Sequence, residues 1–247
     1  MSNAAMMSAR LPVAFTRLLP CLLSACLAGM PLAVAAADER VVPAHEEPRH
    51  VPKFTNAWVR VIDVEIPEGE RTLFHTHALD YPYLMVSSVT LRNQVYGQEA
   101  KDMPITRGLV GYYNASTQGA YTHRFINLGP GTFRAIGIEL LQPPSGSGTA
   151  AAPIPSQPGV TTVVDNDRVR AYRFVLAPGQ SLGPITIAGP SLRVALTDGA
   201  ITDQAAGAAP DEVRVAPAQF AFSERSRTIT VSNRGAEPVE WVEFEFK

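Results

Sequence analysis

The chain has very little cysteine. Its 247 residues include two, Cys21 and Cys26, and both lie within residues 1–37. If that segment is removed, the remaining protein has no disulfide bond, no thiolate metal ligand and no cysteine nucleophile. Its fold must then be stabilised by an apolar core, which a hydrophobic content of 46% can supply.

Charge is also scarce. Charged residues make up 18% of the chain, the formal net charge is −2, and no run of Lys or Arg occurs. A basic patch is the electrostatic signature of proteins that bind nucleic acid or an anionic membrane surface, so neither partner is expected. The sequence also lacks a nucleotide-binding fingerprint and a phosphate-binding loop.

Residues 1–37 predict a signal peptide for export. Arg10 and Arg17 precede an apolar stretch, residues 18–37, that ends in small residues and offers Ala-x-Ala cleavage patterns. Two prolines interrupt this stretch, which argues against a permanent transmembrane helix.

The same segment allows a second interpretation. Residues 23–26, Leu-Ser-Ala-Cys, resemble a bacterial lipobox, in which Cys26 becomes the lipidated first residue. Plain cleavage is favoured because the apolar stretch continues past Cys26. We expect a bacterial protein that is periplasmic or secreted and has no membrane span, with a lipoprotein anchored through Cys26 as the alternative.

The rest of the chain has a β pattern. Short apolar or alternating runs, such as residues 59–66 and 133–141, are separated by Gly, Pro and Asn, which is typical of all-β sandwiches and barrels. A segment rich in Pro, Gly, Ser and Ala predicts a linker. The predicted organisation is a signal peptide at 1–37, an N-terminal barrel at 38–142, a linker at 143–159 and a C-terminal barrel at 160–247.

The two halves repeat each other. Residues 56–61 align with 166–171 at an offset of 110, and Asn127-Leu-Gly aligns with Asn233-Arg-Gly at an offset of 106. A constant register with shared turn residues on both sides of a linker predicts two similar barrels in tandem.

Three histidines form a candidate metal site. His75 and His77 are two residues apart, so on a strand both side chains project from one face, and His123 belongs to a separate predicted strand. Three imidazoles can hold a divalent metal ion and leave other coordination positions for water or substrate. His45 and His50 precede the barrel, match no motif and are predicted to be surface residues.

These histidines and their flanks resemble the cupin superfamily. The first cupin motif is G-x5-H-x-H-x3-4-E-x6-G, and its opening matches Gly69, His75 and His77. The second motif ends in H-x3-N, which matches His123 and Asn127.

The resemblance covers residues 50–141 well and 160–247 in outline, and residues 55–61 are similar to the opening of small exported bacterial cupins. It implies a bicupin, with two double-stranded β-helix (jelly-roll) barrels in tandem. It also implies a divalent metal ion in the first barrel, commonly iron, manganese, nickel or zinc.

The glutamate of the first motif is missing. Tyr81 stands in its place, with Asp80 one position earlier. Both are candidate catalytic residues: the Tyr81 hydroxyl can donate into the pocket, and Asp80 restores a carboxylate ligand if the strand parity breaks. Tyr83 is a further pocket candidate, as is Arg134, an anion clamp if its strand faces inward. Three neutral imidazoles leave the full metal charge, which favours an anionic substrate, and some cupin dioxygenases resemble this arrangement.

The second half has no equivalent histidines. At the two offsets, His75, His77 and His123 correspond to isoleucines, and this pattern predicts an interior refilled with apolar side chains and no metal site. The three isoleucines are Ile185, Ile187 and Ile229.

Three kinds of function remain open. The first is a metal-dependent oxidoreductase, dioxygenase- or isomerase-like, that acts on a small anionic molecule. The second is a non-catalytic protein that binds a sugar or carboxylate through the metal, and the third is a structural bicupin, with a homodimer as a further expectation. Fold alone does not choose among them.

Overall fold

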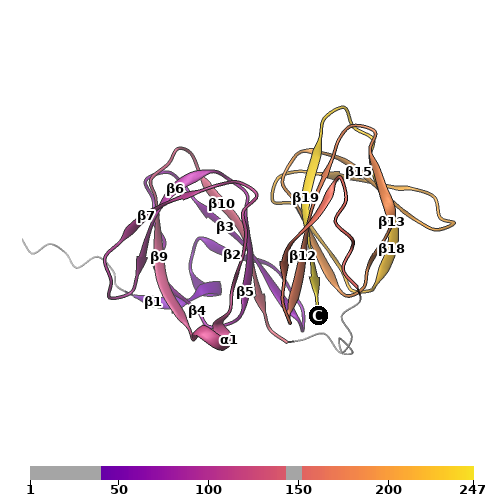
Figure 1. Ribbon diagram of the computed structural model, residues 1–247. Coiled ribbons are helices and arrows are strands. Elements are labelled where there is room, and N and C mark those ends of the chain that lie inside the picture. Colours follow the sequence, from indigo (N-terminus) through magenta and orange to yellow (C-terminus); the bar gives the residue numbers. More distant parts are fainter. Residues whose placement is uncertain (1–39, 143–151) are drawn as a thin grey trace, which may run out of the picture. The chain divides into compact units, whose positions relative to one another are not determined.

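The computed structural model describes residues 40–142 and 152–247 (Figure 1). The predicted signal segment with both cysteines lies outside the described residues, as does the first part of the predicted linker, 143–151. Export and lipidation at Cys26 therefore stay predictions. Where the chain is described, it contains no helix with the length and apolar character needed to cross a membrane.

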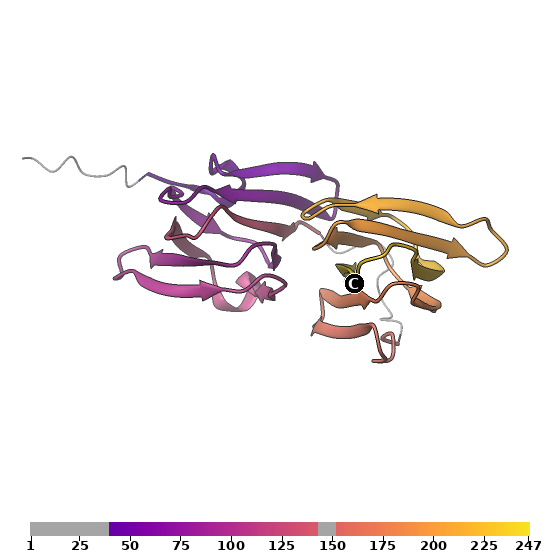
Figure 2. The ribbon, with the colours of Figure 1, turned by 90° about the horizontal axis from the view of Figure 1, so that it is seen from above.

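The described chain forms four sheets, two in each half, and Figure 2 shows the strands of each half as two layers. The first half has two five-stranded sheets. One runs β1 (Val41–Pro43), β4 (Phe74–His77), β9 (Tyr121–Asn127), β6 (Val89–Val95) and β7 (Lys101–Ile105). The other runs β2 (His50–Thr55), β3 (Val59–Ile66), β10 (Phe133–Leu140), β5 (Tyr81–Met85) and β8 (Val110–Tyr113). A 3-10 turn, η1 (Ala44–Glu46), and a short helix, α1 (Ala115–Gln118), complete this half.

The second half repeats the design. Its first sheet runs β11 (Val160–Asp165), β12 (Val169–Leu176), β19 (Val239–Phe246), β14 (Ser191–Ala195) and β17 (Phe220–Ser223). Its second sheet runs β13 (Ser181–Ile187), β18 (Arg227–Asn233), β15 (Gly199–Ala205) and β16 (Asp211–Val215). The predicted fold class, two all-β barrels in tandem, is confirmed.

The central strands are buried on both faces. In β10, Phe133 and Ala135 face the inside of the first barrel, whereas Ile136 and Ile138 belong to an apolar cluster that also contains Phe244 of β19. Alternate residues of a strand point to opposite faces, so a strand between two cores needs apolar residues at both parities. This explains why residues 133–141 read as an almost continuous apolar run.

The repeat found in the sequence is confirmed by the strand register. His75 is the partner of His123 in the β4–β9 pair, and Ile185 is the partner of Ile229 in the β13–β18 pair. These pairs are related by the offsets of 110 and 106 that the sequence predicts. The ligand positions of the two barrels are therefore structurally equivalent.

Two asparagines at equivalent positions of the two barrels bind backbone carbonyl groups through their side-chain amides. The Asn127 Nδ2 group donates to the Ile66 and Gly131 carbonyls, at 2.8 and 2.7 Å. The Asn233 Nδ2 group donates to the Leu176 carbonyl at 3.0 Å and to the carbonyl four residues further along at 2.8 Å. Each buried amide thus fixes the chain at the end of the strand that carries the third ligand position, which is why the motif requires asparagine there.

The end of the predicted linker packs against the second barrel. Ile154 is buried in the second apolar core, and its N–H donates to the Tyr172 hydroxyl at 3.1 Å. One apolar residue in a stretch of Pro, Ser and Gln is too weak a signal for the sequence to separate residues 152–159 from the rest of the linker.

Candidate metal site

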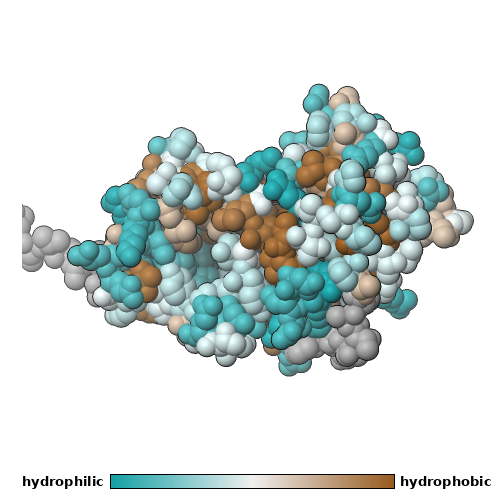
Figure 3. Space-filling view, in the orientation of Figure 1, coloured by the Kyte–Doolittle hydropathy of each residue, from teal (hydrophilic) through white to brown (hydrophobic). Residues whose placement is uncertain are grey.

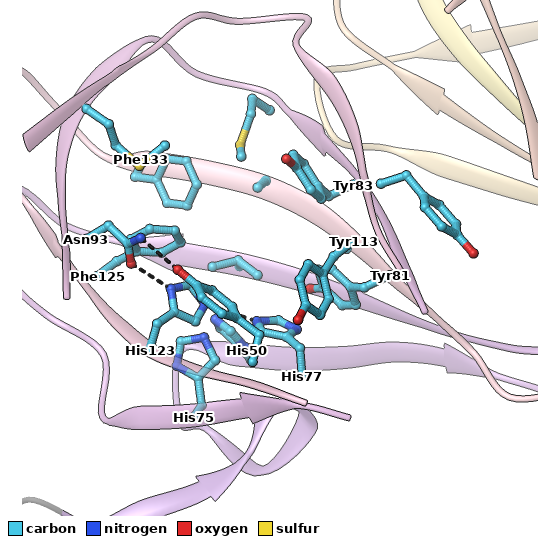
Figure 4. A pocket seen from close by; sticks show the side chains of 17 residues that line it. His50, His75, His77, Tyr81, Tyr83, Asn93, Tyr113, His123, Phe125 and Phe133 are labelled. Carbon is cyan, nitrogen blue, oxygen red and sulfur yellow. Dashed lines mark hydrogen bonds between the residues drawn. The ribbon is translucent and has the colours of Figure 1, made fainter. Parts of the chain in front are cut away.

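Three histidines converge inside the first barrel (Figure 4). His75 and His77 project from the same face of β4, and the register places His123 of β9 directly opposite His75. All three are buried, and one nitrogen from each lies within 4.8 Å of the other two. In the described part of the chain, no other set of three or more His, Cys, Asp or Glu side chains converges in this way.

Hydrogen bonds orient two of the rings. His75 Nδ1 donates to the Leu73 carbonyl at 3.0 Å, and His123 Nδ1 donates to the Asn93 side-chain oxygen at 2.8 Å. Each bond places the proton on Nδ1 and leaves a lone pair on Nε2, the arrangement that metal-binding histidines use. Asn93 is itself held, because its Nδ2 group donates to the Tyr121 hydroxyl at 2.8 Å.

The nitrogens that face one another are poorly satisfied without a metal. His75 Nε2 is buried without a hydrogen-bond partner, and the Nε2 atoms of His77 and His123 lie 3.2 Å apart. Buried polar atoms are seldom left unpaired in native proteins. A divalent cation accepts lone pairs from all three nitrogens, so these residues fit a metal ion, and imidazole ligands suit zinc, iron, copper and nickel.

Burial keeps the rings neutral. It lowers the pKa of His75 to about 4 and that of His77 to about 3, and the neighbouring His75 lowers the latter further. Burial also lowers the pKa of His123 well below its ordinary value. Neutral imidazole is the metal-binding form, so the barrel prepares its ligands at neutral pH.

A fourth histidine lies beside the site. His50 is buried, its Nδ1 donates to the Ala44 carbonyl at 2.9 Å, and its ring centre is 4.3 Å from that of His75. The prediction that His50 is a surface residue is wrong, because η1 turns the chain so that β2 begins inside the barrel. The repeat could have revealed the burial of His50, because the offset of 110 aligns His50 with the apolar Val160, which is buried in the second barrel.

Of the two predicted catalytic residues, one lies in the site. The Tyr81 ring lines the cavity with its centre 4.4 Å from that of His77, and burial raises the pKa of its phenol, so it remains a donor. Asp80 is not among the residues that line the cavity. Its Oδ1 accepts from the backbone N–H and the hydroxyl of Ser116, both at 2.9 Å, and its Oδ2 lies 3.3 Å from Arg168.

Of the two further pocket candidates, one lines the cavity and the other does not. Tyr83 lines the cavity, whereas Arg134 is on the opposite face of β10 and pairs with Asp63 at 2.9 Å. The predicted anion clamp is therefore wrong, because the strand parity turns Arg134 away from the barrel interior.

The site opens into a cavity of about 280 Å³, and Figure 3 shows the face of the first barrel hollowed. Aromatic side chains dominate its wall. Its lining residues are His50, Val64, His75, His77, Tyr81, Tyr83, Met85, Asn93, Met103, Tyr112, Tyr113, Tyr121, His123, Phe125, Phe133, Ala135 and Gly137.

Gly137 makes room for this cavity. A Cβ atom at this position would lie 1.7 Å from the Tyr81 hydroxyl, so any larger residue would displace the Tyr81 ring. Gly137 pairs with Tyr83 in the β10–β5 ladder, and the corresponding pair of the second barrel is Glu243 with Arg193. This role could not be predicted from the sequence, because glycine in a strand has several explanations.

The interior of the second barrel is only partly apolar. Ile185, Ile187 and Ile229 are buried, as predicted. The positions equivalent to the cavity wall instead carry a cluster of four charged residues, in which Glu243 pairs with Arg193 and Arg227, and Asp203 pairs with the same two arginines. The prediction that apolar side chains fill the interior of the second barrel is therefore confirmed at the positions equivalent to the three metal ligands. It is wrong at the positions equivalent to the cavity wall. The four residues are Arg193, Asp203, Arg227 and Glu243.

Comparisons with known proteins bear on the fold. No protein-family model matches the chain, and a comparison with curated proteins found no match. Solved structures do match. Oxalate decarboxylase of Bacillus subtilis, a protein with Mn(II) centres, has a TM-score of 0.52 at 10% identity, over 82% of this chain and 76% of that one.

Two further structures have different functions. Salicylate 1,2-dioxygenase of Pseudoaminobacter salicylatoxidans has a TM-score of 0.50 at 10% identity, over 76% of this chain and 71% of that one. Procruciferin, an 11S globulin of Brassica napus, has a TM-score of 0.51 at 10% identity, over 76% of both chains. The chain therefore has the bicupin fold that its motifs predict, and identity this low carries the likeness no further than the fold.

Proposed function

We propose that this protein is a metal-dependent enzyme of the bicupin class. It holds one divalent metal ion with His75, His77 and His123 and acts on a small molecule in the cavity above them, in the manner of a dioxygenase. The observation that carries the proposal is the convergence of three buried neutral imidazoles at the end of a cavity large enough for a compact ligand.

The metal ion, the cavity wall and Tyr81 would have different roles in this function. When bound, the metal ion supplies a Lewis-acidic centre that polarises an oxygen of the substrate. The wall of the cavity is mainly aromatic, and Tyr81, whose ring lies beside His77, remains protonated and can act as a hydrogen-bond donor. Three protein ligands leave coordination positions for the substrate.

The metal is tested by stoichiometry. We expect one iron, manganese, nickel or zinc ion per full-length chain after reconstitution, measured by elemental analysis after gel filtration. His75→Ala, His77→Ala and His123→Ala should each reduce occupancy strongly, because two imidazoles rarely retain a divalent ion. Asn93→Leu should weaken metal affinity about 10- to 100-fold, since it removes the acceptor that orients His123.

His45→Ala is the matched control. His45 lies outside the cavity and should be replaceable with no loss of metal. A wild-type chain that binds none of the four ions, or a triple alanine variant that keeps its metal, would refute the proposed site. A metal-loaded protein that binds small molecules without converting them would instead support the non-catalytic binding function.

We also propose that the protein is exported, on the basis of the charged and apolar segments within residues 1–37. The intact mass of the protein from a periplasmic extract should correspond to a chain that begins near residues 36–38. Lipid on Cys26 would favour the anchored alternative, and a cytosolic protein that retains residues 1–30 would contradict both.

A further inference from the structure

The cavity wall carries no formal charge. Seventeen residues line it, all of them described, and none is Lys, Arg, Asp or Glu. The equivalent wall of the second barrel contains Arg193, Asp203 and Arg227. In the first barrel, a bound metal ion would therefore be the one source of positive charge in the cavity. The wall has no charged side chain that could pair with a second ionised group of a ligand.

Some polar groups of the wall are hydrogen-bonded within the protein. Both polar groups of Asn93 are used, the oxygen by His123 and the nitrogen by Tyr121. The Tyr113 hydroxyl donates to the Gly119 carbonyl at 2.8 Å. The other polar groups of the wall include the uncharged hydroxyls of Tyr81 and Tyr83, which can hydrogen-bond a ligand but supply no charge to pair with an ionised group.

The remaining surface is apolar and aromatic. Phe133 and Tyr83 lie on the side of the cavity away from the histidines, as Figure 4 shows, and Met85 and Phe125 also line the cavity. Flat rings and thioethers of this kind pack well against a planar ligand. A volume of about 280 Å³ is at the lower end of small-molecule sites, so the ligand is compact.

We infer that the substrate is a compact, predominantly apolar ring compound that binds the metal through one oxygen or two adjacent oxygens and has no second charged group. This inference rests on the proposed function and specifies its substrate class. A divalent ion keeps its full positive charge when its three histidine ligands are neutral. It can therefore stabilise a negative charge on the oxygens that bind it. The expectation of an anionic substrate is thereby narrowed to an anion whose charge lies on the metal-binding atoms.

One wall residue allows this to be tested with little risk to the fold. Met103 of β7 lines the cavity and is 37% exposed, so a longer polar side chain can be accommodated there. Met103→Arg adds a positive charge at the rim, and Met103→Leu is the uncharged control.

The experiment compares two ligands that differ by one carboxylate. Catechol and 3,4-dihydroxybenzoate are titrated into the Co(II)-loaded full-length protein, with binding followed by the visible spectrum of the metal. We expect 3,4-dihydroxybenzoate to bind at least tenfold more weakly than catechol. The difference should shrink at least threefold in Met103→Arg and stay unchanged in Met103→Leu.

A second comparison does not depend on the metal. Phenol and 4-hydroxybenzoate are titrated into the metal-free protein by calorimetry, and phenol should again bind more tightly. If the protein binds neither cobalt nor any of iron, manganese, nickel and zinc, the proposed function fails, and this comparison still decides the preference of the wall. Equal or tighter binding of the carboxylate-bearing partner, or no binding of catechol and phenol, would overturn the inference.

Discussion

The metal-free protein should lose stability steeply when the pH falls below about 6.5. Burial holds the pKa of His75 at about 4 and that of His77 at about 3, and it lowers those of His50 and His123 well below their ordinary value. In the unfolded chain each imidazole has a pKa near about 6.5. Below that pH the unfolded state binds more protons than the folded state, so acid favours unfolding.

The expected size follows from the number of groups. Each buried neutral histidine costs about 1.4 kcal/mol of unfolding free energy per pH unit between its unfolded and folded pKa values. His75 and His77 alone give a loss on the order of 2 kcal/mol between pH 6.5 and 5.5, and the lowered pKa values of His50 and His123 act in the same direction. Urea melts of the chelator-treated protein at pH 7.5, 6.5 and 5.5 measure it.

The second barrel suggests the control. A variant with His75→Ile, His77→Ile and His123→Ile carries the residues that the second barrel has at the same positions. Of the four buried histidines only His50 remains in this variant, so the loss of stability between pH 6.5 and 5.5 should be much smaller than in the parent protein. Parallel loss of stability in both proteins would mean that the three histidines are not buried in their neutral form.

Glu243→Ala should strongly destabilise the second barrel. The Glu243 side chain is 1% exposed, its Oε2 lies 3.0 Å from Arg193 Nε, and its Oε1 pairs with Arg227. Burial favours the neutral acid, yet the two guanidinium charges outweigh it and hold the pKa of Glu243 below its ordinary value. Removing the carboxylate leaves Asp203 alone beside the buried Arg193 and the partly buried Arg227, which should cost about 3–5 kcal/mol.

Two variants give this prediction its controls. Glu65→Ala removes an exposed carboxylate beside Arg134 and should cost less than about 1 kcal/mol. Arg193→Leu combined with Glu243→Leu replaces a buried pair by apolar side chains and should be less destabilising than either single change. A loss for Glu243→Ala no greater than that for Glu65→Ala, measured by urea melts, would show that the cluster is solvated.

The sequence determined the parts of this protein that depend on local pattern. Strand periodicity placed His75 and His77 on one face, because the side-chain direction in a strand alternates with a period of two. The constant offsets of 110 and 106 fixed which residues of the two barrels are equivalent, down to the pairing of Ile185 with Ile229. These features hold wherever the strands lie in space.

Only the tertiary structure decided which other side chains join the histidines. His50 enters the site because η1 directs β2 into the barrel, and Asn93 reaches His123 because β6 pairs with β9. Asp80 is excluded because it is held by Ser116 and Arg168. The positions of Asn93 and Asp80 depend on contacts between segments far apart in the chain, which no local pattern encodes. The cavity wall also depends on tertiary packing, since Gly137 leaves room for the Tyr81 ring at a position where the second barrel has a buried glutamate.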